Sequence, residues 1–269
     1  MDIKGKTAIV TGAAAGIGRA SAIALARCGA ARLIIVDVDE AGMAETARLV
    51  EEHGAAADTH RLDLSDIPAL ETWLAGAGGY DILFNNAGVV SGAPQFPEAS
   101  VARLRFIVDV NLTAAIVATQ AAAQAMRVRG GGVIVNTIST VALGRGFSDA
   151  LYAATKGGLM MFTRSCASLK ESWNVRVMGM LPGLTNTPIL RKTGADGDYA
   201  PWMAPILAAN AMCAPEDIAD GVIDLIEDDA LAGGDWVAVR RIDGAIVRQW
   251  GHDEGQSEMR KRLLEVVTE

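Results

Sequence analysis

The sequence predicts an α/β fold in which a doubly wound, Rossmann-like parallel sheet of about seven strands carries helices on both faces. Short β-branched segments alternate with longer helical patterns, beginning with 7–11 before 18–28 and 33–37 before 40–52. The strand segments are almost entirely apolar, as expected for strands that are buried on both faces. Because 51% of the 269 residues are apolar, the chain 1–269 can bury one large core, and we expect a single dinucleotide-binding and catalytic domain.

The remaining elements continue this alternation. Further strands are expected at 59–62, 82–84, 132–137, 175–181 and 236–242, and further helices at 67–74, 99–126 and 150–172. The segment 188–215 contains Gly, Pro, Trp and Met without a clear period, which predicts a mobile flap over a substrate pocket. The tail after Gly251 has a charged, helical pattern.

Composition and charge argue against several classes of function. The net charge is −8 with both signs interspersed, so we expect no nucleic-acid partner. The three cysteines stand apart without a C-x-x-C pair, which is typical of the reducing cytosol. No apolar run approaches the roughly 20 residues of a membrane span, and no signal peptide precedes the first strand. No histidine or carboxylate cluster has metal-ligand spacing. We therefore expect a cytoplasmic protein without a membrane or metal partner.

A glycine-rich turn follows the first predicted strand. Gly12, Gly16 and Gly18 are spaced G-x-x-x-G-x-G and open a helix, where a dinucleotide pyrophosphate can approach backbone N–H groups and the positive helix end. Asp37 ends the second predicted strand, where its carboxylate can accept hydrogen bonds from the adenosine ribose and would repel a 2′-phosphate. The alternative for the glycines is a turn that only packs helix on strand, and the alternative for Asp37 is a turn aspartate or one that caps the next helix.

Polar residues also follow the third and fourth predicted strands. Asp63-Leu64 and the Asn-Asn-Ala-Gly run at 85–88 both stand where strands end. Open α/β folds bind ligands at this carboxyl edge of the sheet. Ordinary turn chemistry favours the same residue types, so each motif alone leaves both interpretations open.

Ser139, Tyr152 and Lys156 form a third cluster. The spacing of four residues places Tyr152 and Lys156 on one helix face. A phenol with a pKa of about 10 is a poor base at neutral pH, but a neighbouring ammonium and an oxidised nicotinamide both favour the phenolate. Ser139 follows the fifth predicted strand and can donate a hydrogen bond to a substrate oxygen that gains charge. The alternative is a packed tyrosine beside a solvated lysine.

Taken together, these segments closely resemble the short-chain dehydrogenase/reductase family from Lys6 to about Gly244. The features in the family's order are the glycine turn, Asp63, the 85–88 run, Asn111, Ser139, Tyr152, Lys156 and Pro182-Gly183. The resemblance implies that Tyr152 acts as acid and base, and that Lys156 lowers its pKa and holds the nicotinamide ribose. It also implies that Ser139 orients the carbinol and that Asn111 supports a water relay to Lys156.

The resemblance further implies a site for NAD. Contacts are expected at Gly12, Ala14, Gly16, Ile17, Gly18, Asp37, Val38, Asp63, Leu64, Asn86, Ala87, Gly88, Pro182, Gly183, Leu184 and Thr187, besides Tyr152 and Lys156. NADP-preferring relatives usually carry a basic residue at the positions of Ala15 or Val38, so this sequence favours NAD, although Arg19 and Arg32 lie nearby. The family also implies a homotetramer or homodimer.

The expected reaction is NAD-linked oxidation of a secondary alcohol. Segments 138–151 and 182–190 look most like alcohol dehydrogenases of the 15-hydroxyprostaglandin type. The resemblance implies a hydrophobic substrate site lined by Val90, Leu143, Phe147, Leu184, Ile189 and Trp202. Phe147 and Trp202 are equally compatible with core or subunit contacts, and Arg145 either pairs with a substrate carboxylate or is a solvated loop residue. The alternative functions are an NADPH-dependent ketone or 3-oxoacyl reductase, and a non-catalytic NAD(H)-sensing protein.

Overall fold

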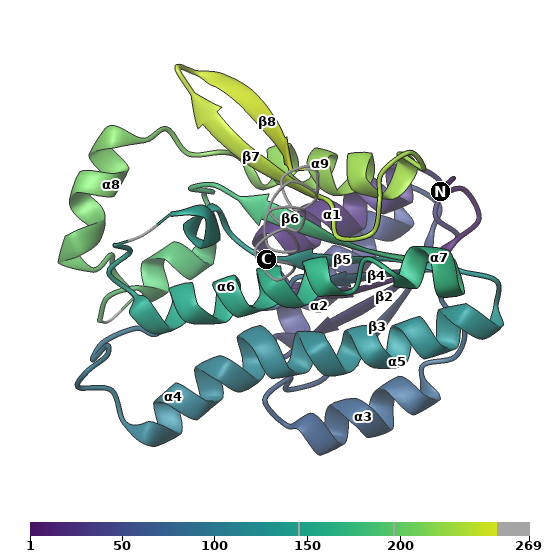
Figure 1. The fold of residues 1–269 in the computed structure, drawn as a ribbon, viewed down its shortest axis with the longest axis horizontal. Coiled ribbons are helices and arrows are strands. Elements are labelled where there is room, and N and C mark those ends of the chain that lie inside the picture. The colour runs from purple at the N-terminus through teal and green to yellow at the C-terminus, as the bar shows by residue number, and fades with distance from the viewer. Residues whose placement is uncertain (145, 196, 252–269) are drawn as a thin grey trace, which may run out of the picture.

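The protein is built on an eight-stranded sheet in the order β3-β2-β1-β4-β5-β6-β7-β8 (Figure 1). The computed structural model describes residues 1–144, 146–195 and 197–251. The strands are β1 (Thr7–Thr11), β2 (Arg32–Asp37), β3 (Ala56–Arg61), β4 (Ile82–Asn85), β5 (Gly132–Thr137), β6 (Val175–Pro182), β7 (Trp236–Ile242) and β8 (Ala245–Gly251). All pairings are parallel except β7 with β8. The predicted doubly wound sheet is confirmed, and because β1 lies between β2 and β4, the chain changes direction of winding there.

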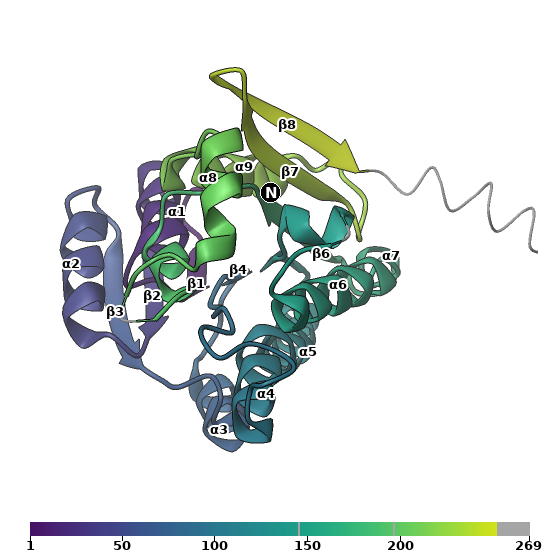
Figure 2. The same ribbon diagram turned by 90° about the vertical axis from the view of Figure 1, so that its left-hand side faces the viewer.

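Helices cover both faces of the sheet, as Figure 2 shows. The helices are α1 (Gly16–Arg27), α2 (Glu40–Glu51), α3 (Ile67–Gly76), α4 (Val101–Val108), α5 (Ala114–Val128), α6 (Ala150–Ser165), α7 (Leu169–Trp173), α8 (Ala204–Ala209) and α9 (Pro215–Glu227). One core cluster joins Leu25 of α1, Met43 of α2 and Leu225 of α9 to one face of the sheet. A second cluster joins α3 and α5 to the other face. The central strands β4, β5 and β6 are buried along their whole length, which explains their apolar sequences, whereas the edge strands β3 and β8 have no fully buried residue.

The long helix expected at 99–126 runs from Val101 to Val128 and contains a π-helical segment, Asp109–Thr113. By length and apolar composition this helix could cross a membrane, contrary to the expectation from the sequence. Its alanines, including Ala118 and Ala122, are instead buried against the sheet in the second core cluster. The helix is therefore a core helix of the domain.

The β7–β8 hairpin is an element that the sequence analysis missed. Asp243 and Gly244 connect the strands with φ values of 51° and 81°, the positive pair that a two-residue type I′ turn requires. Arg248 of β8 forms an ion pair with Asp224 of α9 at 3.0 Å. The Asp-Gly dipeptide between alternating apolar residues was the signal for this hairpin.

The segment 188–215 contains short helices rather than an extended loop. Two 3₁₀ turns, Pro188–Lys192 and Pro201–Met203, precede α8. The isolated bridge between Thr185 and Cys213 joins the two ends of the segment. In Figure 1, α8 lies on the left, on the side where α6 begins.

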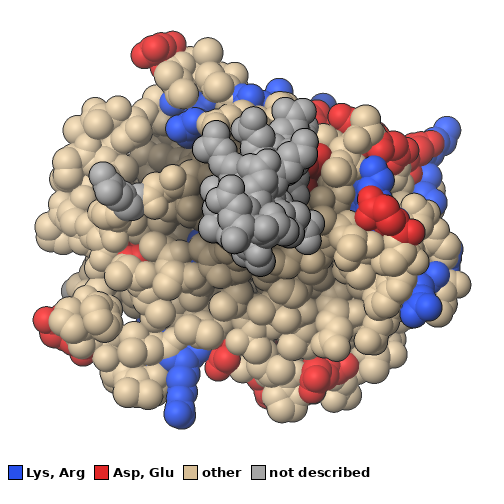
Figure 3. All heavy atoms as spheres, in the orientation of Figure 1, with Lys and Arg blue, Asp and Glu red and all other residues tan. Residues whose placement is uncertain are grey.

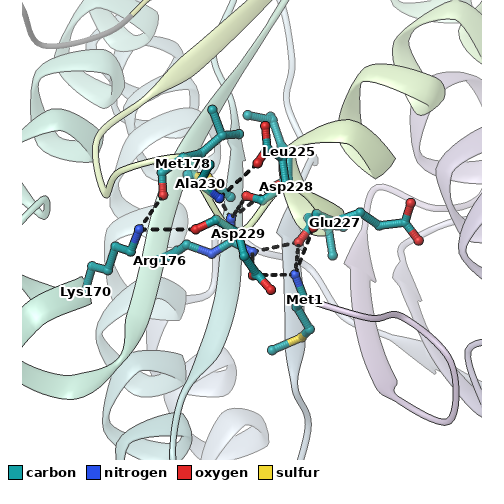
Figure 4. A network of polar contacts seen from close by, with 11 residues as sticks. Met1, Lys170, Arg176, Met178, Leu225, Glu227, Asp228, Asp229 and Ala230 are labelled. Atoms are coloured by element: carbon teal, nitrogen blue, oxygen red, sulfur yellow. Dashed lines mark hydrogen bonds and ion pairs between the residues drawn. The ribbon is translucent and has the colours of Figure 1, made fainter.

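A polar cluster fastens the opposite, amino edge of the sheet (Figure 4). Arg176, at the start of β6, is buried, and its guanidinium donates to Asp229 at 3.0 Å. It also donates to the carbonyl oxygens that end α9, those of Leu225, Ile226 and Asp228. The amino group of Met1 and the ammonium of Lys170 bond the same chain segment. Cations at this end of α9 satisfy its free carbonyl groups and favour its negative dipole end.

The surface carries charges of both signs. On the face shown in Figure 3, acidic and basic side chains alternate around the rim, and the described residues of that face form no continuous basic stripe. The tail 252–269, whose pattern predicts a helix, lies outside the described residues.

Candidate active site

The glycine turn between β1 and α1 is packed tightly against the loop that follows β4. Gly12 has a φ of +64°, and a Cβ there would lie 2.7 Å from the Cα of Ala87. A Cβ on Gly18 would collide with the carbonyl oxygen of Gly12. Close packing therefore explains two of the glycines by itself.

The beginning of α1 also suits a phosphate. Its N-cap residue, Ala15, makes no side-chain hydrogen bond to the helix, and its first turn contains no acidic residue. The free N–H groups and the positive dipole end are thus left without a protein anion to compensate them. Gly16, with a φ of +54°, keeps the turn clear of Thr187, whose methyl group would lie 3.0 Å from a Cβ at position 16. The residues present fit a dinucleotide pyrophosphate.

Asp37 lies at the carboxyl end of β2, next to this turn. One carboxylate oxygen accepts from the N–H of Ala14 at 3.0 Å, and the other accepts from Val38 at 2.7 Å and Asp39 at 3.2 Å. Asp37 does not cap α2, because Asp39 holds that position. The capping interpretation of Asp37 is therefore wrong, whereas the bonds from Val38 and Asp39 agree with a turn aspartate.

The nearby arginines differ in their surroundings. Arg32 begins β2, at the opposite end of the strand from Asp37, and pairs with Asp58. Arg19 donates to Thr46 at 3.0 Å and to the carbonyl oxygens of Ala14 and Gly42. The sequence analysis overlooked Arg61, which is the register partner of Asp37 across β2 and β3 and pairs with Glu40 at 3.4 Å.

The polar residues that follow β3 and β4 have different roles. The carboxylate of Asp63 accepts from the N–H and hydroxyl of Ser65 at 2.9 and 2.8 Å, an ordinary turn. The Asn86 amide donates to the carbonyl oxygens of Thr11 and Gly12 at 3.1 and 3.2 Å. Asn86 therefore braces the glycine turn with its side chain, while Leu64 packs partly buried against the second core cluster.

Asn111 lies in the π-helical segment and clamps the backbone after Gly88. Its amide accepts from the N–H of Val89 and donates to the carbonyl oxygen of Val89, both at 2.8 Å. It also donates to Thr155 of α6 at 3.3 Å. The π-helical turn is what brings this side chain toward the loop, as such turns often do at functional sites.

Ser139, Tyr152 and Lys156 meet at the carboxyl edge of the sheet. Ser139 follows β5 and lies close enough to Tyr152, on the first turns of α6, to lower the pKa of its phenol. The Lys156 ammonium lies 5.7 Å from the centre of the Tyr152 ring and donates to the carbonyl oxygen of Thr137 at 2.8 Å. A Cβ at position 88 would lie 3.4 Å from both Lys156 Nζ and Asn111 Oδ1. A side chain at position 88 would therefore touch both groups, and glycine keeps that position beside the ammonium unfilled.

Burial shifts both titratable groups of this cluster toward their neutral forms. Burial raises the pKa of Tyr152 to about 12, with a hydrogen bond from Ser139 lowering it and the charge of Asp149 raising it. Burial lowers the pKa of Lys156 to about 8. The resemblance implies that Lys156 lowers the pKa of Tyr152, but in this structure burial dominates and the group that lowers it is Ser139.

The chain after β6 returns over the glycine turn. Gly183 lies against β7, because its N–H donates to the carbonyl oxygen of Val239 at 2.8 Å. The carbonyl oxygen of Leu184 accepts from Cys213 at 2.8 Å, and Thr187 contacts Gly16. The structure thus brings the 182–187 segment and the glycine turn to one edge of the sheet.

A match to known proteins decides the family. The family model described as short chain dehydrogenase matches residues 6–198. The chain belongs to the short-chain dehydrogenase family. Its fold, the predicted resemblance and its oxidoreductase class are therefore confirmed.

Individual relatives in the family have different substrates. This short-chain dehydrogenase is 33% identical to the cis-4-hydroxycyclohexanecarboxylate dehydrogenase of Sinomonas cyclohexanicum over 84% of this chain and 90% of that one. It is 34% identical to the NAD(+)-type 15-hydroxyprostaglandin dehydrogenase of Bos taurus, over 87% and 90% of the two chains. A solved structure from Beutenbergia cavernae, a proposed NAD(P)-dependent gluconate 5-dehydrogenase with bound NADP, has a TM-score of 0.78 and 31% identity, over 88% and 97%. The family uses nicotinamide cofactors of both kinds.

An aromatic wall adjoins the tyrosine of this dehydrogenase. The Phe147 ring lies 6.1 Å from the Tyr152 ring and 5.3 Å from the Trp202 ring, measured between centres, the second pair being T-shaped. Leu143 is 43% exposed, whereas Val90 is buried. Phe147 and Trp202 thus join α6 to the 188–215 segment, and Arg145 lies outside the described residues.

Sequence reasoning missed several residues that shape this site. Thr11 accepts at its hydroxyl from the N–H groups of Asn86 and Ala87 at 3.0 and 3.1 Å. Thr137 supplies the acceptor for Lys156. Asp149 caps α6, and Ser91 bonds it. Of these, only the capping aspartate three residues before Tyr152 has a signal in the sequence, because aspartate is a preferred N-cap.

Proposed function

We propose that this dehydrogenase oxidises apolar secondary alcohols to ketones with NAD, using Tyr152, Ser139 and Lys156. The observation that carries the proposal is the meeting of these three side chains beside the space at Gly88. Ser139 lies close enough to Tyr152 to lower the pKa of its phenol, and the Lys156 ammonium lies 5.7 Å from the centre of the Tyr152 ring. An acid and base, a hydrogen-bond donor and a cation are thereby directed at one position, as hydride transfer from a carbinol requires.

Each residue has a distinct role in this proposal. NAD, when bound, supplies the hydride acceptor. Tyr152 takes the hydroxyl proton of the alcohol, while Ser139 donates a hydrogen bond to the carbinol oxygen. The charge of Lys156 favours the phenolate of Tyr152. Its ammonium has three donors, and the described residues provide one acceptor, Thr137 O, so the others are free for ribose hydroxyl groups.

The proposed preference for NAD rests on Asp37. Its carboxylate lies next to the glycine turn and faces the edge where the adenosine ribose would bind. Asp39 and Glu40 follow it directly and add negative charge. A 2′-phosphate would be repelled there, and Arg19 already donates to Thr46 and two backbone carbonyl groups.

The proposed substrate is an alcohol on an apolar ring. Phe147 lies against Tyr152 and packs edge to face with Trp202, so the two rings provide apolar surface on this side of the site. Val90 and Ile189 extend the apolar lining proposed for the site. The similar cis-4-hydroxycyclohexanecarboxylate dehydrogenase is named for a cyclic alcohol. The 188–215 segment, which carries Trp202, acts in this proposal as the flap that closes over the ring.

An NADPH-dependent ketone reductase is the second candidate, and Arg61 favours it. This side chain is 66% exposed and stands beside Asp37 in the register of β2 and β3. A guanidinium at that place can bind a 2′-phosphate if it leaves Glu40. The ion pair is exposed and therefore weak.

We further propose a cytoplasmic homotetramer. Three exposed apolar side chains support a contact between subunits. They are Phe96 (62% exposed), Val101 on α4 (64%) and Met161 on α6 (55%). Analytical ultracentrifugation of the purified protein tests the assembly, and a monomer at all concentrations would contradict it.

A parallel assay with both cofactors tests the proposed reaction. Purified protein is mixed with NAD⁺ or NADP⁺ and a panel of cyclic, aryl, steroid and acyclic secondary alcohols, and absorbance of the reduced cofactor is followed. Turnover with NAD⁺ and cyclic alcohols is expected. Better kinetics with NADP⁺ would mean that Arg61 rather than Asp37 decides the preference, and turnover confined to short acyclic alcohols would contradict the apolar ring.

A further inference from the structure

Asp149 is a buried carboxylate that the proposed reaction does not use. It is 1% exposed. One of its oxygens accepts from the Ser91 hydroxyl at 2.6 Å and from the N–H of Tyr152 at 3.1 Å. The other accepts from the N–H of Ser91 at 2.8 Å. A single side chain thus caps α6 at Tyr152 and holds the loop that follows β4.

The loop bonded by Asp149 is fixed on its other side by Arg103 of α4. The guanidinium of Arg103 donates to the carbonyl oxygens of Ser91 and Val90 at 2.9 and 3.1 Å. At the next residue, a Cβ on Gly92 would lie 3.5 Å from the carbonyl oxygen of Lys192 in the 188–215 segment. The loop therefore contacts α4, α6 and the proposed flap.

We propose that Asp149 is a positioning residue that sets Tyr152 at a fixed distance from the Val90–Gly92 loop and so defines the width of the alcohol pocket. This inference rests on the proposed function, because it assigns a role in the same site. A carboxylate suits the role better than a neutral cap, since both of its oxygens accept and all three donors are satisfied. A residue that only capped α6 would need just the bond from the N–H of Tyr152, and its carboxylate would not have to be buried.

The charge of Asp149 also faces Tyr152. The other groups that face Tyr152 are Lys156 on the same helix, the neutral hydroxyl group of Ser139 and the ring of Phe147. Ser91 bonds Asp149, and Arg103 bonds the backbone of Ser91. Among the residues that the structure describes, Asp149 is the anion whose charge acts on Tyr152, and this charge raises the pKa of the phenol. Removing its charge without changing its shape therefore shifts the ionisation of Tyr152 to lower pH.

Three variants separate positioning from simple capping. Asp149→Asn keeps a cap oxygen for Tyr152 but places an amide donor opposite the N–H of Ser91. Ser91→Ala keeps the charge and removes the 2.6 Å bond. Asp66→Asn is the matched control, because Asp66 caps α3 through the N–H of Ala69 at 3.1 Å and is exposed.

Three measurements are made on each variant. The first is an absorbance titration of tyrosinate, from which the curve of the Tyr152→Phe protein is subtracted. The others are the affinity for NADH and the steady-state kinetics of alcohol oxidation. For Asp149→Asn we expect ionisation of Tyr152 at lower pH, kcat/KM for the alcohol reduced roughly tenfold to a hundredfold and unchanged affinity for NADH. Ser91→Ala should have a lower kcat/KM, but its Tyr152 should not ionise at lower pH. Asp66→Asn should match the unmodified protein in the titration, the NADH affinity and the kinetics.

Two results would overturn the inference. One is an Asp149→Asn protein whose tyrosine titration and kcat/KM match those of Asp66→Asn. The other is a Ser91→Ala protein with unchanged alcohol kinetics, which stays informative if Asp149→Asn fails to fold. A protein that is inactive with every alcohol would contradict the proposed function. The titration needs no turnover, so it would still show whether Asp149 acts on Tyr152.

Discussion

Two buried cations stand at opposite edges of the same sheet, and their surroundings differ. Arg176, at the amino edge, donates to three backbone carbonyl groups and to Asp229. Lys156, at the carboxyl edge, has one acceptor among the described residues, the carbonyl oxygen of Thr137. Burial lowers the pKa of both side chains.

The difference indicates that Arg176 stabilises the fold, whereas Lys156 keeps donors available for a ligand. At Arg176 the desolvation cost is offset by hydrogen bonds to carbonyl groups that would otherwise lack partners. At Lys156 the cost is largely uncompensated, which is expected where a ligand is to complete the hydrogen bonds. The two edges therefore predict opposite effects on stability when their cations are removed.

The largest effect on stability is expected at the amino edge. Arg176→Met should lower the free energy of unfolding by about 2 to 4 kcal/mol, because the carbonyl oxygens at the end of α9 lose their donors. Urea unfolding at neutral pH measures this change. Arg48→Met is the control, since Arg48 is exposed and its partners among the described residues are the exposed Glu45 and Glu52. A loss no greater than that of the control would contradict the structural role of Arg176.

At the carboxyl edge, Lys156→Met should raise stability by an amount on the order of 1 to 3 kcal/mol at neutral pH, because the buried ammonium is removed. The pKa of Lys156 falls from an ordinary 10.5 to about 8 in the folded protein. Below pH 8 both the folded and unfolded chains are protonated, so the gain is complete there. The gain in stability shrinks between pH 8 and 10.5, because there Lys156 loses its proton in the folded protein but keeps it in the unfolded chain. Above pH 10.5 the gain vanishes. Unfolding curves across this range measure it, and a gain independent of pH would exclude the charge as its cause.

The partly buried Asp37 and the exposed Arg61 at the carboxyl edge should have smaller effects, confined to cofactor choice. Asp37→Ala is expected to reduce the preference for NAD⁺ over NADP⁺ about tenfold, or about 1.4 kcal/mol. Arg61→Ala should leave NAD⁺ kinetics unchanged, because Arg61 pairs with Glu40 rather than with Asp37. The ratio of kcat/KM values for the two cofactors measures both. A large loss of NADP⁺ activity in Arg61→Ala would identify Arg61 as a phosphate ligand.

Much of the fold was predictable because each strand and helix has a local signature. Apolar runs mark β1, β2, β4, β5, β6 and β7, and Gly12 to Gly18 mark the first βα turn. The sequence predicts β3 to begin at residue 59 rather than 56, because none of its six residues is fully buried and four of them are polar. The β8 hairpin was missed although Asp243-Gly244 signals it.

The site was predictable only in part. Tyr152 and Lys156 share a helix face, which spacing alone reveals. The bonds of Asn111 to Val89, of Thr11 to the 86–87 backbone and of Asp149 to Ser91 join residues far apart in the chain. No local pattern encodes such contacts, and the depth of burial that sets the pKa values of Tyr152 and Lys156 likewise depends on the complete fold.

The most direct test of the central claim is to compare the unmodified protein with Tyr152→Phe in alcohol oxidation with NAD⁺ and in NADH binding. The phenol is the proposed acid and base, and the cofactor is proposed to bind mainly at the glycine turn. We predict that turnover falls about a thousandfold while the Kd for NADH stays within a few fold. Turnover that survives the loss of the hydroxyl group would contradict the proposed mechanism.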